Sequence, residues 1–215
     1  MAIIAPSILS ADFANLGRDV ALAEKAGAQW LHLDIMDGHF VPNLTIGPAI
    51  VEALRPHSKL FFDAHLMIEN PEKYLEPFAK AGADLLCVHL ETVADPKAVL
   101  RQIKALGKKA GLAVNPDKKF EDIQPYLADL DMVLFMSVFP GFAGQKFIAD
   151  ILPEIAKCRA EVNARRLPVD IEIDGGINRT TAKAALDAGV SVLVAGSAIY
   201  KSSDPAAEIH HYISL

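Results

Sequence analysis

Imidazole and carboxylate groups occur at three places inside otherwise apolar sequence. His32 and Asp34 stand two residues apart in "HLDIMDGHF", and residues two apart share one face of a β-strand. His65 lies in "DAHLM", and Asp174 ends "IEID". Brought together, two imidazoles and two carboxylates would form a nitrogen and oxygen ligand set for a divalent ion such as Zn²⁺, Fe²⁺, Mn²⁺ or Co²⁺.

The alternative is that each of these residues is a core polar group with its own partner. Buried charges need a pairing partner or a metal, and the segments 30–36, 60–67 and 169–174 contain no Arg or Lys. We therefore favour a metal site with one divalent ion per chain, and we expect Zn²⁺ first. His89 in "LLCVHLE" is interpreted as a residue behind the ligands or in the core. Four others are interpreted as surface residues: His39, His57, His210 and His211.

Three glycine-containing segments favour an anion site. They are "PGFAGQ" (140–145), "DGG" (174–176) and "AGSAIY" (195–200). Small residues let backbone N–H groups approach a phosphate, and a short helix starting after Ser197 would point its N-terminus at it. A single glycine cluster more often marks only a tight turn, but three clusters in consecutive loops favour phosphate binding.

A repeating unit predicts the elements that position these residues. "KAGAQWLHLD", "KAGADLLCVH" and "DAGVSVLVAG" each end a helix with Gly and then begin an apolar strand. Helix starts are predicted at Asn70-Pro71, Asp95-Pro96 and Asp204-Pro205. Eight strands, each followed by a helix, are predicted near 3–9, 30–36, 60–67, 84–90, 110–115, 131–138, 169–174 and 191–196.

Alternating strands and helices of this kind predict one (β/α)₈ TIM barrel that spans residues 1–215 as a single domain. A doubly wound open sheet is the alternative, although no GxGxxG follows the first strand. Active sites of such barrels lie at the carboxyl ends of the strands. The unusual polar residues are predicted there, in strands 1, 2, 3 and 7: Ser7, His32, Asp34, His65 and Asp174.

Strands 2 and 7 lie on opposite sides of a barrel mouth, so Asp34 and Asp174 could face a substrate from both sides. Two such bases suit epimerisation, because one removes a proton and the other returns it on the opposite face. A metal ion would stabilise the enediolate between these steps. Three methionines could exclude water from it or simply fill the core: Met36, Met67 and Met136.

The composition excludes several classes of function. The chain has 215 residues, is 52% hydrophobic and carries a net charge of −6, so it offers no basic surface for nucleic acid. No apolar run reaches the roughly 18 residues of a membrane span, and the start lacks the charged region of a signal peptide. Cys87 and Cys158 lie outside any CxxC and are typical of reduced thiols. We expect a cytoplasmic protein that forms a homo-oligomer.

Six motifs in order along the chain resemble the ribulose-phosphate 3-epimerase family. They are "APSILSADF", "HLDIMDGHFVPNLTIGP", "HLM", "SVFPGFAGQKF", "DGGIN" and "AGSAIY". The resemblance implies a metal-dependent TIM barrel that interconverts D-ribulose 5-phosphate and D-xylulose 5-phosphate at C3. It also implies a place in the pentose phosphate pathway or the Calvin cycle, with a ketose phosphate as the small-molecule partner.

Site residues follow from this resemblance by position. The metal ligands would be His32, Asp34, His65 and Asp174, and the acid/base pair would be Asp34 and Asp174. Ser7 would contact substrate, as would His32, His65 and the three methionines named above. The phosphate contacts would be Gly141, Phe142, Ala143, Gly144, Gly175, Gly176, Gly196 and Ser197.

Other functions remain as alternatives. Many family members have Asn where Phe139 stands and Gly where Ala143 stands, and Ala143 also occurs in epimerases of D-allulose 6-phosphate. Phosphosugar or nucleotide decarboxylases on similar barrels use a catalytic Lys, which the strand ends here lack. A phosphosugar-binding barrel without catalysis would be expected to lose a ligand or an Asp, whereas all four residues are present.

Overall fold

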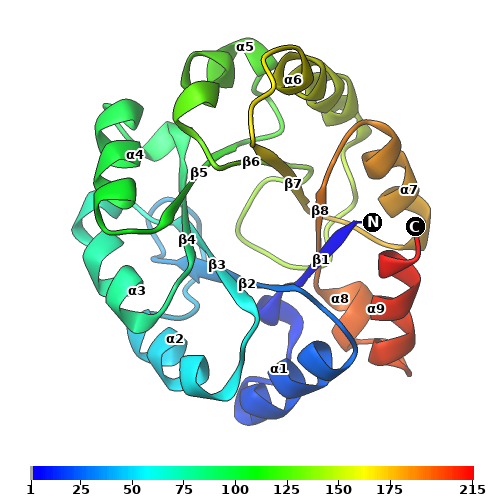
Figure 1. Cartoon of the computed structure of the whole chain (residues 1–215). Coiled ribbons are helices and arrows are strands. Elements are labelled where there is room, and N and C mark those ends of the chain that lie inside the picture. The colour runs from blue at the N-terminus through cyan, green and yellow to red at the C-terminus, as the bar shows by residue number, and fades with distance from the viewer. Residues whose placement is uncertain (1) are drawn as a thin grey trace.

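The computed structural model of the protein describes residues 2–215, in which eight parallel strands form a barrel (Figure 1). The strand order is β1-β8-β7-β6-β5-β4-β3-β2, and a parallel bridge between Ser7 and His32 connects β1 to β2. The strands are β1 (Ile3–Pro6), β2 (Trp30–Met36), β3 (Phe61–Met67), β4 (Leu85–His89), β5 (Lys109–Val114), β6 (Met132–Met136), β7 (Asp170–Asp174) and β8 (Val192–Ala195). The predicted barrel is confirmed, and the open-sheet alternative is wrong.

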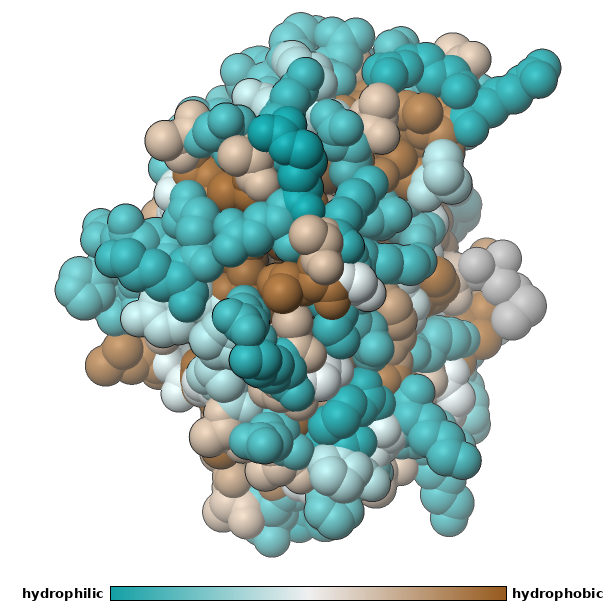
Figure 2. Space-filling model, turned by 60° about the vertical axis from the view of Figure 1, so that its left-hand side comes forward, coloured by the Kyte–Doolittle hydropathy of each residue, from teal (hydrophilic) through white to brown (hydrophobic). Residues whose placement is uncertain are grey.

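Helices surround the barrel on the outside (Figure 1). They are α1 (Leu16–Lys25), α2 (Pro48–Leu54), α3 (Leu75–Ala81), α4 (Pro96–Ala105), α5 (Phe120–Ile123), α6 (Leu152–Ala164), α7 (Arg179–Asp187), α8 (Ser197–Tyr200) and α9 (Pro205–Ile213). Short 3₁₀ turns occupy the connections Ile8–Ser10, Phe13–Asn15, Arg55–His57, Pro71–Lys73, Leu90–Thr92, Gln124–Asp129 and Ala149–Ile151. Figure 2 shows a mainly hydrophilic outer face with hydrophobic residues in small separate patches.

Two of the three predicted helix starts are confirmed. Asp95 and Asp204 accept hydrogen bonds from the backbone N–H groups of Ala98 and Ala207, and a proline follows each Asp. The prediction at Asn70 is confirmed only in part, because the helical segment that begins at Pro71 is a 3₁₀ turn. Asn70 has a left-handed φ of 50° and makes no side-chain cap, so only a 3₁₀ turn follows it before α3. Asn tolerates this conformation, whereas an N-cap residue needs extended backbone.

Glycines end the helices that precede β2, β4 and β8, as the repeat predicts. Gly82, after α3, has a φ of 109°, and a Cβ atom there would lie 2.5 Å from Cγ of Arg55. Both the left-handed backbone and the close approach therefore require Gly. The tight turn returns the chain directly to the bottom of β4.

Both faces of the strands are buried. One face packs against the helices through a large apolar cluster that includes Leu33, Phe62 and Leu66. The other face fills the inside of the barrel, where small and sulfur-containing residues such as Ala5, Cys87 and Met132 pack together. Both cysteines are buried free thiols. No helix within residues 2–215 has the length and apolar character needed to cross a bilayer.

Candidate active site

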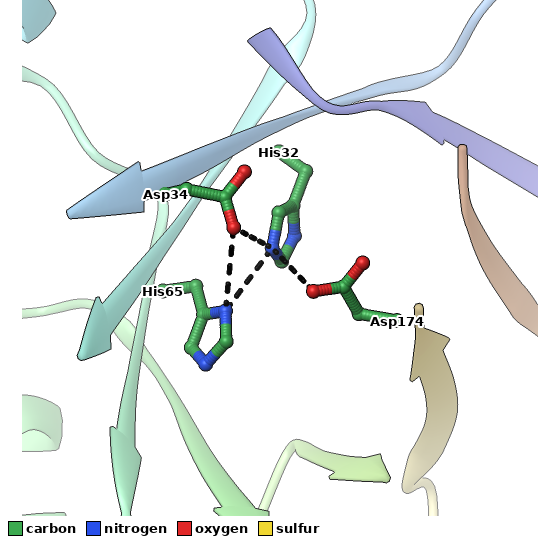
Figure 3. Close-up of side chains that lie close together, drawn as sticks. All are labelled: His32, Asp34, His65 and Asp174. Carbon is green, nitrogen blue, oxygen red and sulfur yellow. Dashed lines mark hydrogen bonds and ion pairs between the residues drawn. The ribbon is translucent and has the colours of Figure 1, made fainter. Parts of the chain in front are cut away.

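The strand register brings three predicted ligands close together near the carboxyl end of the barrel. Parallel pairing places Asp34 of β2 beside His65 of β3, and His32 lies two residues before Asp34 on the same face. Asp174 ends β7 and reaches the same point from across the barrel (Figure 3). The barrel fold therefore brings Asp34 and Asp174 together although they lie 140 residues apart in the sequence.

The four side chains turn one atom each toward a common centre (Figure 3). Nε2 of His32 lies 3.5 Å from Oδ1 of Asp34, 3.2 Å from Nδ1 of His65 and 4.0 Å from Oδ2 of Asp174. Nδ1 of His65 lies 3.8 Å from Oδ1 of Asp34. Ligands of a tetrahedral zinc ion at its usual bond lengths are about 3.3 Å apart. The donor set and its spacing thus fit a divalent ion.

The two carboxylates have different surroundings. Oδ2 of Asp34 accepts a 2.6 Å hydrogen bond from the Ser7 hydroxyl, and the side chain is buried. Asp174 is more open, with 18% of its side chain exposed. The Ser137 hydroxyl lies within hydrogen-bonding distance of the backbone carbonyls of Asp174 and Gly175, which anchors the end of β7. Asp34 is therefore the more constrained of the two carboxylates.

The pKa values of the four cluster residues are shifted in different directions. Burial raises the pKa of Asp34, but electrostatic attraction to His32 and to the nearby His65 outweighs burial, so its pKa lies below the usual range. Burial, together with repulsion from Asp34, raises the pKa of Asp174 to about 7. Burial lowers the pKa of His32, but Asp34 and Asp63 reverse this, and the pKa lies well above its ordinary value. For His65, burial dominates and its pKa is lowered.

A pH-dependent stability difference follows from Asp174. Its folded-state pKa of about 7 lies above the ordinary 3.8, so the folded protein binds the extra proton and loses stability as pH rises from about 4 to about 7. Asp174→Asn removes this loss. In the presence of chelator, the variant should therefore unfold at a higher temperature than wild type at about pH 8. The difference should shrink as pH falls toward about 4. A difference that is the same at both pH values would contradict this.

Two buried carboxylates below the cluster were missed by the sequence analysis. Asp63 Oδ2 lies 2.6 Å from Nδ1 of His32, and Glu172 Oε1 lies 3.6 Å from the same nitrogen. Both side chains are fully buried. Asp63 stands two residues before His65, and Glu172 two residues before Asp174, so the alternation that grouped His32 with Asp34 could also have found them. Asp63 lies at the level of His32 in the strand register, and both carboxylates come two residues before a predicted ligand of their own strand.

The other histidines fall into three groups. His89 is fully buried behind His65, as predicted for a core residue or one behind the ligands. His39, His57 and His210 are exposed, which confirms that prediction. His211 is half-buried, so the surface prediction is confirmed only in part. Its Nε2 atom is shielded from solvent and has no hydrogen-bond partner among residues 2–215.

A cavity of about 500 Å³ opens above the cluster, which is a size suited to a small metabolite. Asp34 and Asp174 line it, whereas His32 and His65 lie buried beneath it. Every other predicted substrate contact lines this cavity: Ser7, Met36, Met67, Met136, Gly141, Phe142, Ala143, Gly144, Gly175, Gly176, Gly196 and Ser197. Among the residues that line it in the described chain, Lys146 is the single basic one.

Glycines shape one side of the cavity. Gly176 has a φ of 62°, and a Cβ atom there would lie 2.6 Å from the backbone nitrogen of Phe147. The loop after β7 can therefore lie directly against the loop after β6 only because residue 176 lacks a side chain. Gly196 similarly lies against Ser10, whose hydroxyl would be 2.8 Å from an added Cβ. Both glycines also line the cavity.

Comparison with known proteins agrees with this geometry. The profile of the ribulose-phosphate 3 epimerase family matches residues 3–200. This chain belongs to the ribulose-phosphate 3-epimerase family. It is 50% identical to the ribulose-phosphate 3-epimerase of Bacillus subtilis over 94% of this chain and 93% of that protein. It is 48% identical to that of Synechocystis over 96% of this chain and 91% of that protein.

As a member of the ribulose-phosphate 3-epimerase family, the chain is an epimerase of the isomerase class. A more distant likeness concerns the fold alone. The crystal structure of KGPDC from Streptococcus mutans superposes with a TM-score of 0.71 at 14% identity, covering 100% of this chain and 97% of that chain. The barrel is thus shared well beyond the family, while the residues of the cluster must be argued from this chain.

Proposed function

We propose that this protein interconverts D-ribulose 5-phosphate and D-xylulose 5-phosphate by two-base proton transfer at C3. One observation carries the proposal. Asp34 of β2 and Asp174 of β7 reach one cluster from different sides of the cavity floor, with their cluster-facing oxygens within 4.8 Å of each other. A carbon placed above the cluster would have one carboxylate on each face, as inversion of a C–H centre requires.

The cluster would hold one divalent ion through His32, Asp34, His65 and Asp174, with Zn²⁺ proposed first and Fe²⁺, Mn²⁺ or Co²⁺ as alternatives. When bound, the ion would supply positive charge that stabilises the enediolate form of the substrate. Asp34 turns Oδ1 toward the cluster, while its Oδ2 accepts the hydrogen bond from the Ser7 hydroxyl. A carboxylate oxygen has two lone pairs, so Oδ2 can keep the Ser7 hydrogen bond on one and accept the C3 proton on the other.

The remaining cavity residues orient the substrate and exclude water. Met36 and Met67 end neighbouring strands and are buried beside the cluster with Val41. Their apolar side chains keep water from the reacting carbon, which protects a carbanionic intermediate. We assign the phosphate to the loops after β6, β7 and β8, whose glycines present backbone N–H groups. Binding energy from this remote group supports the transition state as well as substrate affinity.

Further parts of the proposal concern the protein as a whole. We propose one catalytic domain over residues 1–215, a cytoplasmic location, assembly as a homo-oligomer, and a role in the pentose phosphate pathway or the Calvin cycle. D-allulose 6-phosphate is a second candidate substrate, because Ala143 lies exposed on the cavity wall where a longer sugar phosphate would extend. A barrel that binds phosphosugars without catalysis is the third candidate.

A substrate comparison tests this function. We expect kcat/KM for D-ribulose 5-phosphate to exceed that for D-allulose 6-phosphate, and unphosphorylated ribulose to be turned over far more slowly than either. The physical reason is that loss of the phosphate removes remote binding energy from the transition state. The measurement is a steady-state assay of all three sugars with equal metal content. A clear preference for D-allulose 6-phosphate would support the second candidate, and no turnover of any sugar would support the third.

A further inference from the structure

His65 has contacts on both of its ring nitrogens. Nδ1 faces the ligand cluster, 3.2 Å from Nε2 of His32. On the opposite side, Nε2 of His65 lies 2.8 Å from Nε2 of His89, the last residue of β4. Nδ1 of His89 in turn lies 3.3 Å from Oε2 of Glu91. Three side chains thus form a continuous line from the cluster outward.

The hydrogen positions along this line are determined by the contacts. Two ring nitrogens 2.8 Å apart need one donor and one acceptor. Nδ1 of His65 must present a lone pair to an ion in the cluster, so the hydrogen of His65 is on Nε2 and is donated to His89. His89 then carries its own hydrogen on Nδ1 and donates it to the Glu91 carboxylate. One arrangement of hydrogens satisfies every contact.

We propose that Glu91 and His89 are positioning residues, which hold the His65 ring in the orientation and tautomer that bind the divalent ion. This rests on the metal site of the proposed function and adds two residues to it. Partners of this kind fix a ligand imidazole and increase its basicity as a ligand.

Packing holds this line of three side chains, here called the relay (His65, His89 and Glu91), in place. His65 and His89 are stacked with ring centroids 5.0 Å apart and an interplanar angle of 25°. The ring of Phe40 lies on His89 with centroids 4.7 Å apart. Glu91 is held from the other side, because its Oε1 accepts the backbone N–H of Asn115 at 3.0 Å. Neither side chain is free to turn without losing a specific contact.

The two ligand histidines are supported in different ways. His32 donates directly to Asp63, deep inside the barrel, whereas the support of His65 ends at Glu91 near the rim. The Glu91 side chain is 17% exposed and touches no member of the ligand cluster. A change at Glu91 therefore tests the relay without altering a ligand or the cavity wall.

Glu91→Gln is the informative substitution. The Gln amide oxygen can keep the bond from Asn115, but its NH₂ group would then face the Nδ1–H of His89, so donor would meet donor. The zinc dissociation constant should rise by about 10- to 100-fold, measured by competition with a chromophoric chelator. In ¹⁵N-histidine spectra of the zinc-loaded protein, the protected Nδ1–H signal of His89 should be lost, while that of the His32 Nδ1–H should remain.

Two further variants make the test decisive. Glu154→Gln is the matched control, because the Glu154 carboxylate also accepts a backbone N–H, from Phe120, but lies away from the cavity. It should leave zinc affinity unchanged. His89→Phe keeps a ring of similar size without an acceptor and should weaken zinc binding at least as much as Glu91→Gln. If wild type binds zinc and both relay variants bind it equally well with unchanged spectra, the relay is wrong. If wild type binds no zinc, the metal site and the relay both fail.

Discussion

Replacing Asp174 by Asn should lower kcat by about 10²- to 10⁴-fold, the usual effect of losing a positioned acid/base group. Asn keeps the shape and one oxygen that could still act as a ligand, but it cannot accept a proton. Asp34→Asn should cause a loss of the same order, because epimerisation needs a base on each face. The measurement is kcat for D-ribulose 5-phosphate in both directions, normalised to bound metal.

Solvent exchange distinguishes the two bases. With wild type in D₂O, the product should gain deuterium at C3, because the base that returns the proton differs from the one that removes it. A variant that keeps its metal can still introduce solvent deuterium into unreacted substrate on the face whose Asp remains. Asp174→Asn and Asp34→Asn should therefore label different substrates, one of them D-ribulose 5-phosphate and the other D-xylulose 5-phosphate. If either variant keeps its metal and epimerises at a near wild-type rate, the assignment of two bases is wrong.

Much of the fold could be predicted because the relevant interactions are local. Each strand is a short apolar run between a Gly-terminated helix and a polar loop, and this pattern repeats along the chain. The alternation in β2 also placed His32, Asp34 and Met36 on one face, which the structure confirms. Asn70 shows the limit of such local rules. Asn before Pro suits both an N-cap and a left-handed turn, and the surrounding chain selects the turn.

The depth of each polar group inside the barrel could not be predicted in the same way. Asp63 and Glu172 follow the same alternation as the predicted ligands, and the register places Asp63 beside His32, two residues deeper than Asp34 and His65. Register depends on how eight strands tilt and close, which no single segment encodes. The same holds for the 2.6 Å bond between Ser7 and Asp34, which joins β1 to β2 where the barrel closes. The different environments of the two carboxylates follow from these long-range contacts.

Removing the divalent ion should abolish turnover, and adding Zn²⁺ or Fe²⁺ should restore it, with about one ion bound per chain. The donor atoms of the cluster already lie within 4.8 Å of one another, so the ion would enter a site that needs little rearrangement. Binding should weaken as pH falls, because the carboxylates around His32 raise its pKa and a proton then competes for its Nε2.

The variants His65→Gln and His210→Gln distinguish metal bound at this site from metal bound adventitiously. His210 is exposed on α9, so its variant should keep full occupancy and activity, whereas His65→Gln should lose both. Metal analysis of the purified variants, followed by dialysis against chelator and activity assays with graded Zn²⁺, provides the measurement. Full activity in a preparation shown to be free of metal would exclude this ligand set. Stoichiometric zinc with no turnover of any sugar phosphate would instead mean that the barrel binds its ligand without catalysis, because the same four residues would then hold the ion while the two carboxylates moved no proton.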